Sequence, residues 1–549
     1  MKKWKVTLAC VFASLMSLGQ QDQSPKLVVG IVVDQMCYEY LYRYYDKYCE
    51  GGFKRFMNNG TNCRNTNYNY VPTYTGPGHA SIYTGTTPSD HGIVANEWYS
   101  RHENKEVNCV EDTAVNTIGS ESAYGKYSPQ RLKSNTITDQ LKLTYPKAKV
   151  VSMSIKNRGA ILPGGHLSDG SYWFDFETGQ LISSTFFATE LPNWVQKFNK
   201  RKYPEKCLKE ETWNTLLPIE EYHESLGDDR KYERLLVGKE TPTFPYNLKA
   251  MTNDSLHYGL FTSTPFANTY LTDFALKAIE NEDLGTDGQT DMLCISYSTP
   301  DIIGHSFGPY SIEIEDTYLR LDLEVKRLLQ TLDSNIGKGE YIVFITADHA
   351  VVPVPQFLTD KGLPGGYVFM DSIISTIDSL CELRFGARLL EHCDNLNMYL
   401  NNDRIDSLGL QKNDVVAFFG QHLIPWKGIK RVFTTNELYE AGKDHGWKDM
   451  IRRGIHHRES GDIVVMLEPG YLPKLTDSEE ARKGTSHGSA YGYDTHVPLL
   501  WYGKGIEKQE VFRNINITDI SATLIHMLYL QRPNAMSGQP IVELLPHGR

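Results

Sequence analysis

Five apolar runs of strand length recur along the chain and are separated by stretches with a helical pattern of apolar positions. The runs cover residues 27–34, 148–155, 292–299, 341–347 and 497–503. Continuous apolar runs of this length are typical of strands buried on both faces, and their alternation with helices is typical of parallel sheets. We therefore predict an α/β fold in which a mostly parallel central sheet carries helices on both faces.

Two longer segments interrupt this alternation. Residues from about 190 to 260 are polar, contain prolines and show no sustained period, which indicates an insertion. Residues from about 353 to 480 contain their own short strand-like and helical stretches, which indicates an inserted α+β subdomain. We predict one α/β domain over residues 21–549, with both segments as insertions that pack on it.

The N-terminus has the pattern of an export signal. Three lysines precede the apolar run of residues 6–19, and the small residues Ser17 and Gly19 have the spacing of a signal-peptidase site. The run is short for a membrane span, although an uncleaved N-terminal anchor is the alternative. We predict a signal peptide over residues 1–20 and a periplasmic or secreted protein with no membrane attachment after cleavage.

Charge and cysteine content argue against two other classes of site. The 549-residue chain has a net charge of −11 and no long basic stretch, which argues against nucleic acid as a partner. Its nine cysteines form no CxxC pair, which argues against a zinc site built from thiolates. Cys294 lies inside an apolar run and is predicted to be a buried free thiol. We expect a monomer that acts on small molecules.

Aspartate and histidine residues stand where three of the apolar runs end. Strand ends meet at one rim of a parallel sheet, so residues distant in sequence can form one site there. Three aspartates and three histidines suit Zn²⁺ better than Ca²⁺ or Mg²⁺, and six ligands suit two ions that share a substrate. For any single residue, a capping aspartate or a core histidine is the simpler interpretation. Together they predict a two-metal hydrolase with the ligands Asp34, Asp301, His305, Asp348, His349 and His487.

The segment from 71 to 92 contains a candidate nucleophile. Thr75 precedes Gly76, Pro77 and Gly78, and the residues that follow have the pattern of a helix start. A hydroxyl at this position either caps the helix or reacts, and a helix N-terminus favours a bound anion. The predicted metal ligands favour the reactive role, because metal coordination makes a weak hydroxyl nucleophilic. We predict that Thr75 is the nucleophile.

In this order, the motifs resemble those of the alkaline phosphatase superfamily. The resemblance is strongest to its threonine-nucleophile branch, which includes nucleotide pyrophosphatase/phosphodiesterases and the PafA-type, phosphate-irrepressible alkaline phosphatases. It covers nearly the whole chain after the signal peptide. The resemblance implies that Asp301, His305 and His487 bind one zinc ion. It implies that the other zinc ion is bound by Asp34, Asp348, His349 and the oxygen of Thr75.

The resemblance also implies three contacts to the phosphoryl group. Lys156 and Arg158 match a cationic pair of the monoesterase branch, and Asn96 matches an asparagine that binds a phosphoryl oxygen. Two Zn²⁺ ions balance three carboxylates and a threonine alkoxide, so Lys156 and Arg158 leave two surplus positive charges. That surplus fits the dianion of a phosphate monoester better than a diester. The alternative is that both cations are ordinary solvated residues.

These observations predict a zinc-dependent phosphomonoesterase, an alkaline phosphatase. It would hydrolyse small phosphate monoesters through a phosphothreonine at Thr75 and release inorganic phosphate, with two Zn²⁺ per chain. A phosphodiesterase or nucleotide pyrophosphatase on the same scaffold is the nearest alternative. A non-catalytic protein that binds phosphate or metal is a more remote one. A sulfatase is disfavoured because threonine cannot supply the formylglycine that those enzymes need.

Overall fold

A computed structural model describes residues 24–252, 258–440 and 446–545. The predicted signal peptide lies outside these residues. Within the described ranges, no helix is both long enough and apolar enough to cross a membrane.

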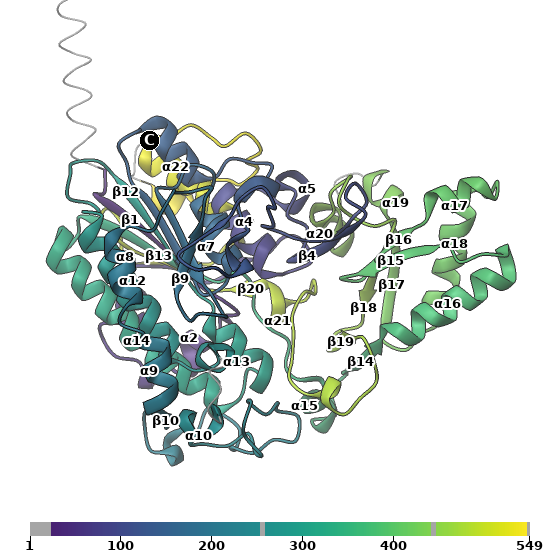
Figure 1. The fold of residues 1–549 in the computed structure, drawn as a ribbon, viewed down its shortest axis with the longest axis horizontal. Coiled ribbons are helices and arrows are strands. Elements are labelled where there is room, and N and C mark those ends of the chain that lie inside the picture. The colour runs from purple at the N-terminus through teal and green to yellow at the C-terminus, as the bar shows by residue number, and fades with distance from the viewer. Residues whose placement is uncertain (1–23, 253–257, 441–445, 546–549) are drawn as a thin grey trace, which may run out of the picture.

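A large sheet forms the centre of the molecule (Figure 1). Its central strand β1 (Leu27–Val33) pairs in parallel with β12 (Asp291–Tyr297) on one side and with β13 (Tyr341–Thr346) on the other. The parallel part continues from β12 through β7 (Val150–Ser154) to β8 (Gly170–Phe174). Every residue of these five strands is buried, as the continuous apolar runs predicted for all of them except β8, which lies outside those runs. The α/β prediction is confirmed.

Towards its edges the sheet contains antiparallel pairs. In the described residues the sheet has ten strands, in the order β22-β2-β21-β13-β1-β12-β7-β8-β9-β6. The run at 497–503 forms β21 (Leu499–Gly503), which pairs with β13 in the antiparallel direction. The run is therefore a strand of the sheet, as predicted, and it is one of the antiparallel strands. The chain enters β21 12 residues after His487 and then runs in the direction opposite to β13. The outer strands are β22 (Gln509–Val511), β2 (Thr61–Cys63), β9 (Leu181–Ser184) and β6 (Thr117–Ile118).

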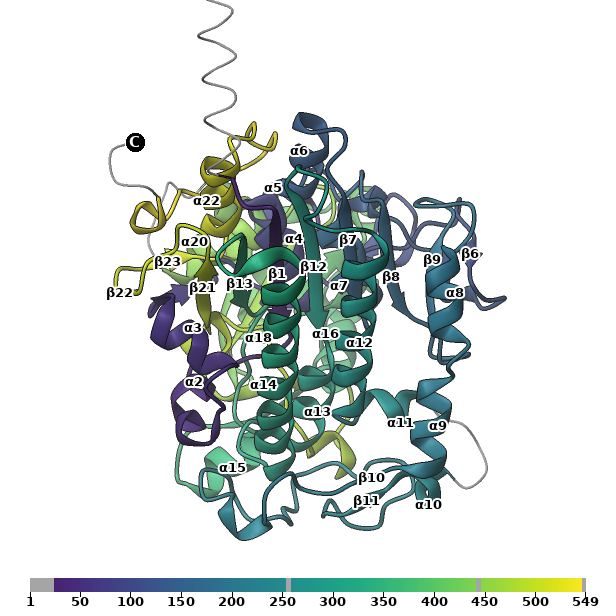
Figure 2. The ribbon, with the colours of Figure 1, turned by 90° about the vertical axis from the view of Figure 1, so that its left-hand side faces the viewer.

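Helices cover both faces of the sheet, and Figure 2 shows α12 and α14 running in front of it. The 21-residue helix α14 begins where the side chain of Ser311 accepts a hydrogen bond from the amide of Ile314, which caps its N-terminus. Helix α4 ends at Gly85, whose positive φ of 69° suits a glycine C-cap. Cys294 is a buried free thiol, as predicted. The main helices are α4 (Thr75–Thr84), α7 (Asn157–Gly164), α12 (Phe266–Asn281), α14 (Ile312–Leu332) and α22 (Asp519–Leu528).

The segment near 190–260 packs on helices of the body. Phe198 packs edge-to-face against Phe274 of α12 with ring centroids 5.1 Å apart. The indole of buried Trp213 donates a hydrogen bond of 2.7 Å to Asp316 of α14. The segment contains α8 (Asn193–Asn199), α9 (Tyr203–Glu210), β10 (Thr212–Trp213), β11 (Tyr246–Asn247), α10 (Leu248–Thr252) and α11 (Tyr258–Thr262).

The segment after residue 365 forms a separate lobe, which projects to the right in Figure 1. Its antiparallel sheet has the order β15-β16-β18-β17 and packs with α16 and α18 around its own apolar core. The parallel pair β14 (Gly366–Phe369) and β19 (Tyr471–Lys474) brings the start and end of the lobe together. The other elements are α16 (Met370–Phe385), β15 (Leu390–Asp394), β16 (Asn397–Leu400), α17 (Asn402–Ser407), α18 (Lys412–Leu423), β17 (Ile429–Thr434), α19 (Thr435–Glu440), α20 (Trp447–Gly454) and β18 (Ile463–Leu467).

Candidate active site

The predicted ligands gather at the carboxyl rim of the parallel strands. Asp34 directly follows β1, and Asp348 and His349 follow β13. Asp301 and His305 lie one turn apart on α13 (Thr299–Phe307), which begins after β12. His487 comes from the segment that returns from the lobe to the body. The fold thus brings all six side chains to one place.

Five of these residues form two groups of metal-ligand geometry. One group is Asp301, His305 and His487, and the other is Asp34, Asp301 and His349. In each group one ligand atom per residue lies within 4.8 Å of the others. The first group contains the same residues that the resemblance assigns to one ion. The second contains Asp301 in the place of Asp348, whose Oδ2 lies 3.7 Å from Nε2 of His349.

The three histidines are oriented as metal ligands by backbone carbonyls. Nδ1 of His349 lies 3.1 Å from the carbonyl oxygen of Ala350. Nδ1 of His487 lies 2.7 Å from the carbonyl oxygen of Thr73, and Nδ1 of His305 lies 2.9 Å from that of Thr485. A carbonyl only accepts, so Nδ1 must donate its proton and Nε2 keeps its lone pair. Each Nε2 faces a carboxylate of the site: that of His349 faces Asp34 at 3.4 Å, and those of His305 and His487 face Asp301 at 3.2 Å and 3.6 Å.

The carboxylates carry more negative charge than their surroundings balance. Asp34 and Asp348 are fully buried, and Oδ1 of Asp34 and Oδ2 of Asp348 have no hydrogen-bond partner among the described residues. Burial, and then the charge of Asp301, raise the pKa of Asp34 to about 6. Burial likewise raises the pKa of Asp348 far above its usual value, with Asp34 adding to the effect. Unpaired buried carboxylate oxygens beside free imidazole nitrogens fit divalent cations.

Lys156 lies between the two groups. Its ammonium donates to Oδ2 of Asp34 at 2.7 Å and to Oδ2 of Asp301 at 2.5 Å. Burial lowers the pKa of Lys156, but the charges of Asp301 and Asp34 outweigh this effect and raise the pKa above its usual value. Lys156 is therefore a fixed positive charge at the rim, held by ligand carboxylates.

Thr75 is the first residue of α4 and is buried at the same rim. Its Oγ1 lies 3.4 Å from Nε2 of His349, so the hydroxyl adjoins the ligand group of Asp34. A side chain at Gly78 would place its Cβ 2.4 Å from the carbonyl oxygen of Asp348, so glycine is needed for α4 to approach this closely. His79 donates from Nδ1 to the carbonyl oxygen of Thr75 at 2.8 Å, which fixes the first turn.

The other two predicted contacts lie at the starts of two helices, Asn96 at α4 and Arg158 at α7. Oδ1 of Asn96 accepts a hydrogen bond of 2.7 Å from the amide of Gly76, which leaves the side-chain NH₂ of Asn96 as a donor. Arg158 stands in the first turn of α7, and its Nε is buried without a hydrogen-bond partner in the described part of the chain. An unpaired guanidinium nitrogen beside a helix N-terminus suits an anion.

The comparisons with known proteins identify the family. The family model of type I phosphodiesterase / nucleotide pyrophosphatase matches residues 28–490. The chain belongs to this family. Two relatives are each 40% identical over 99% of both chains: one from Myroides odoratus named calcium-transporting ATPase, and alkaline phosphatase PafA of Elizabethkingia meningoseptica. A crystal structure of wild-type alkaline phosphatase PafA has a TM-score of 0.90, with 40% identity over 95% of this chain and 99% of that one.

These findings confirm the resemblance, and the chain is an enzyme of the alkaline phosphatase superfamily. The fold of the solved relative agrees over nearly the full length of the chain, so this chain and that relative share the overall architecture. The family membership also implies metal ions, in agreement with the two ligand groups at the rim.

Gln35 is a residue of this site that the sequence analysis missed. Its side-chain Nε2 donates to Oδ1 of Asp301 at 2.6 Å, and its backbone amide donates to Oδ1 of Asp348 at 3.2 Å. It adopts a left-handed conformation, with φ 68°, which is uncommon for glutamine. Its position directly after Asp34 was the only available signal, and that signal is weak. Gln35 orients two carboxylates of the phosphatase at once.

Shortening Gln35 to asparagine should weaken metal binding. Asparagine tolerates the left-handed backbone, but its amide is too short to reach Asp301 in the same way. Loss of such a supporting hydrogen bond lowers metal affinity about 10- to 100-fold. We expect Gln35→Asn to lose activity at a correspondingly lower chelator concentration and to recover it with excess Zn²⁺. Unchanged chelator sensitivity would show that Gln35 does not orient the ligands.

Proposed function

We propose that this enzyme is an alkaline phosphatase that hydrolyses phosphate monoesters with two Zn²⁺ ions and the nucleophile Thr75. The main support is the position of the Thr75 hydroxyl, 3.4 Å from His349 at a rim where two ligand groups meet. The Asp301, His305 and His487 group would hold one ion. Asp34, Asp348 and His349 would hold the other, because Oδ2 of Asp348 is buried and lacks a partner.

The reaction we propose has two displacement steps. The oxygen of Thr75 forms a bond to phosphorus, while the bond from phosphorus to the ester oxygen breaks and the alcohol leaves. Water then attacks the phosphothreonine, which releases inorganic phosphate and restores the Thr75 hydroxyl. The ions, when bound, would promote deprotonation of the two nucleophiles and stabilise charge on the leaving oxygen. Arg158, a charged donor, and Asn96, a neutral donor, would hold the phosphoryl oxygens by hydrogen bonds.

Monoesters are preferred over diesters in this proposal because of charge. Two Zn²⁺ ions would balance the three carboxylates and the alkoxide of Thr75. Lys156 and Arg158 then supply two further positive charges. Diester hydrolysis is the alternative, which the description of the matched family includes. ATP hydrolysis, named for the relative from Myroides odoratus, is chemically compatible because the terminal phosphoryl group of ATP is also doubly charged. All these reactions could use the same nucleophile.

Comparing p-nitrophenyl phosphate with bis-p-nitrophenyl phosphate tests the preference. We expect kcat/KM to be at least about 100-fold higher for the monoester, because hydrogen bonds to charged groups contribute about 1.5–3 kcal/mol each. Arg158→Ala should lower the monoester value by about 10- to 100-fold and the diester value less. Arg201→Ala, at an exposed arginine, is the matched control. Faster turnover of the diester would replace this proposal with a phosphodiesterase.

We further propose export, on the evidence of the lysines and apolar run at the N-terminus. The enzyme would act in the periplasm or outside the cell as a monomer, with small phosphate esters as its substrates.

A further inference from the structure

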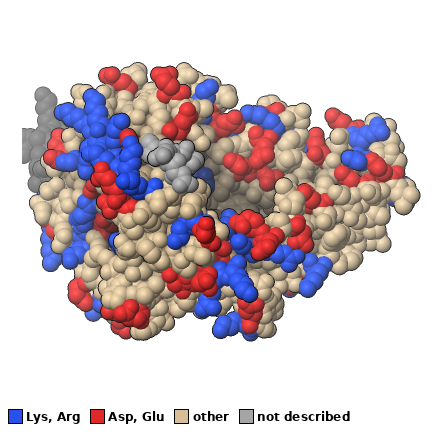
Figure 3. All heavy atoms as spheres, turned by 60° about the horizontal axis from the view of Figure 1, so that its bottom comes forward, with Lys and Arg blue, Asp and Glu red and all other residues tan. Residues whose placement is uncertain are grey.

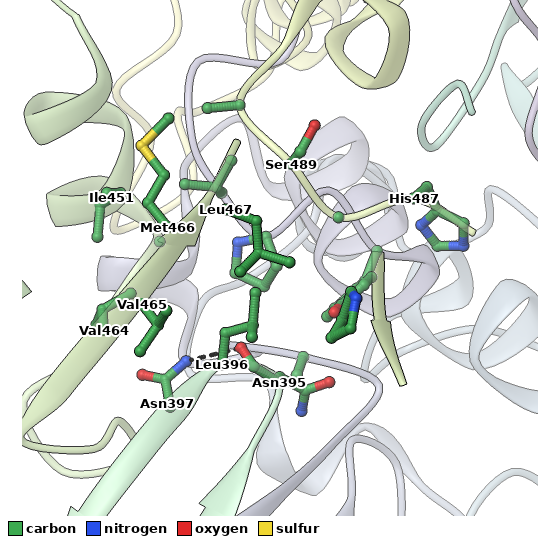
Figure 4. Close-up of a pocket in the computed structure, with 18 of the residues that line it drawn as sticks. Asn395, Leu396, Asn397, Ile451, Val464, Val465, Met466, Leu467, His487 and Ser489 are labelled. Carbon is green, nitrogen blue, oxygen red and sulfur yellow. Dashed lines mark hydrogen bonds between the residues drawn. The ribbon is translucent and has the colours of Figure 1, made fainter. Parts of the chain in front are cut away.

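An apolar pocket lies at the junction of the lobe and the body. Figure 3 shows the surface hollowed between the two, and Figure 4 shows the pocket lining, with Ile451, Val464 and Met466 on one side and His487 on the other. The free volume inside is about 80 Å³. Both the body and the lobe contribute to the lining, so neither part forms this pocket alone.

The pocket borders the proposed reaction centre at three places. Its lining includes Tyr74 and Ala95, which directly precede the nucleophile Thr75 and the anion contact Asn96. It also includes His487, a predicted ligand, whose ring lies edge-on to Tyr74 with centroids 5.5 Å apart. In an in-line displacement the leaving group departs on the side away from the nucleophile. In our assignment that side belongs to the ion held by Asp301, His305 and His487.

The charge of the lining selects against anionic groups. Among its described residues are the carboxyl side chains of Asp394, Glu468 and Asp494, but no lysine or arginine. A negatively charged leaving group would therefore find no cation to pair with here. The apolar walls instead favour an uncharged hydrocarbon group, since burial of apolar surface is what such a pocket can offer.

The lobe contributes a strained turn to the pocket. Asn395 and Leu396 form the two-residue turn between β15 and β16, and both have positive φ values, 49° and 62°. Glycine is preferred at the second position of such a turn, and leucine there is unfavourable by about 1–3 kcal/mol. Asn395 fastens the turn to the body, because its side-chain nitrogen donates to the carbonyl oxygen of Glu97 at 2.6 Å. Strain retained where a side chain lines a pocket suggests a role for that side chain.

We propose that this pocket receives the uncharged aryl or branched alkyl leaving group of the phosphate monoester, with Leu396 as a specificity-determining residue. The proposal rests on the proposed monoesterase function. It assigns the lobe a direct part in substrate choice, because the turn at Leu396 brings an apolar side chain from the lobe beside the rim of the body.

A pair of esters with alcohols of similar acidity tests the proposal. For the unmodified enzyme we expect kcat/KM to be about 10-fold higher for 2-naphthyl phosphate than for phenyl phosphate, as added hydrocarbon in an apolar pocket commonly gives. Leu396→Gly suits the positive φ and so should not destabilise the turn. It should reduce this ratio to about one, while kcat/KM for ethyl phosphate changes less than about two-fold. Leu408→Gly, at the exposed end of α17, is the matched control and should keep the ratio.

Two results would overturn the pocket proposal and leave the monoesterase function intact. One is a 2-naphthyl to phenyl ratio of kcat/KM in Leu396→Gly that equals the ratio of the unmodified enzyme. The other is a ratio near one in the unmodified enzyme itself. Failure of all three monoesters to react would instead overturn the proposed function and this inference with it. If Leu396→Gly does not fold, a second experiment takes the place of this variant. It measures inhibition of the unmodified enzyme by 2-naphthol, which lacks a phosphoryl group. We expect 2-naphthol to inhibit competitively and ethanol at the same concentration not to inhibit. If 2-naphthol does not inhibit either, the proposal is overturned.

Discussion

Replacing Thr75 with alanine should lower kcat for p-nitrophenyl phosphate by about 10³-fold or more, as removal of an enzyme nucleophile does. Thr75 Oγ1 is buried at the rim, 3.4 Å from Nε2 of His349, at the start of α4. The metal content should change little, because aspartates and histidines supply the other predicted ligands. Steady-state kinetics and metal analysis of the purified variant together measure both quantities.

Two further variants separate the role of the hydroxyl from the stability of the helix. Thr75→Ser keeps an oxygen in place and should retain substantial activity. Thr84→Ala, at the other end of α4, removes a hydroxyl that donates to the carbonyl oxygen of Ala80 and should leave kcat nearly unchanged. Acid quenching during turnover should trap phosphate on Thr75 in the unmodified enzyme, detectable by mass spectrometry. Full activity of Thr75→Ala would rule out the phosphothreonine.

The sequence predicted the central strands and the gathering of the ligands for the same physical reason. Strands buried on both faces must be continuously apolar, so β1, β12 and β13 stand out, and residues at their carboxyl ends share one rim. The direction of β21 was not predictable, because apolar composition is the same for parallel and antiparallel strands. It depends on where the preceding residues are held, and His487 holds them at the rim.

Other features of the site depend on tertiary contacts that no local pattern records. Only the contact of its side chain with Asp301 identifies Gln35 as part of the site. Lys156 pairs with Asp34 and Asp301 in the structure, and its contact with the phosphoryl group stays a prediction. The charge argument for monoesters survives this placement, since the cation remains at the rim. Leu396 lies in the lobe, and only the turn of β15 and β16 brings it to the body.

Removal of metal should abolish activity, and the identity of the ion that restores it tests the zinc assignment. Dialysis against a chelator is expected to lower kcat/KM by at least about 10³-fold, because the ions would activate nucleophile and leaving group together. Zn²⁺ should restore activity, whereas Ca²⁺ or Mg²⁺ alone should not, since imidazole nitrogens suit Zn²⁺ better than either. Restoration by Ca²⁺ alone would show that the zinc assignment is wrong.

Asp301→Ala then tests how the two ions divide the ligands. Oδ1 of Asp301 lies 3.2 Å from Nε2 of His305 and 3.6 Å from Nε2 of His487, so its loss should empty that group. The other group keeps Asp34, His349 and Asp348, whose buried Oδ2 is free to bind. We therefore expect bound zinc to fall from about two ions per chain to about one, and kcat/KM to fall by at least about 10³-fold. Loss of both ions would mean that Asp301 bridges the two groups, and retention of both would exclude it as a ligand. Asp90→Ala, a matched control in the surface helix α5 (Pro88–His91), should keep both ions, so the count of zinc per chain separates these three arrangements.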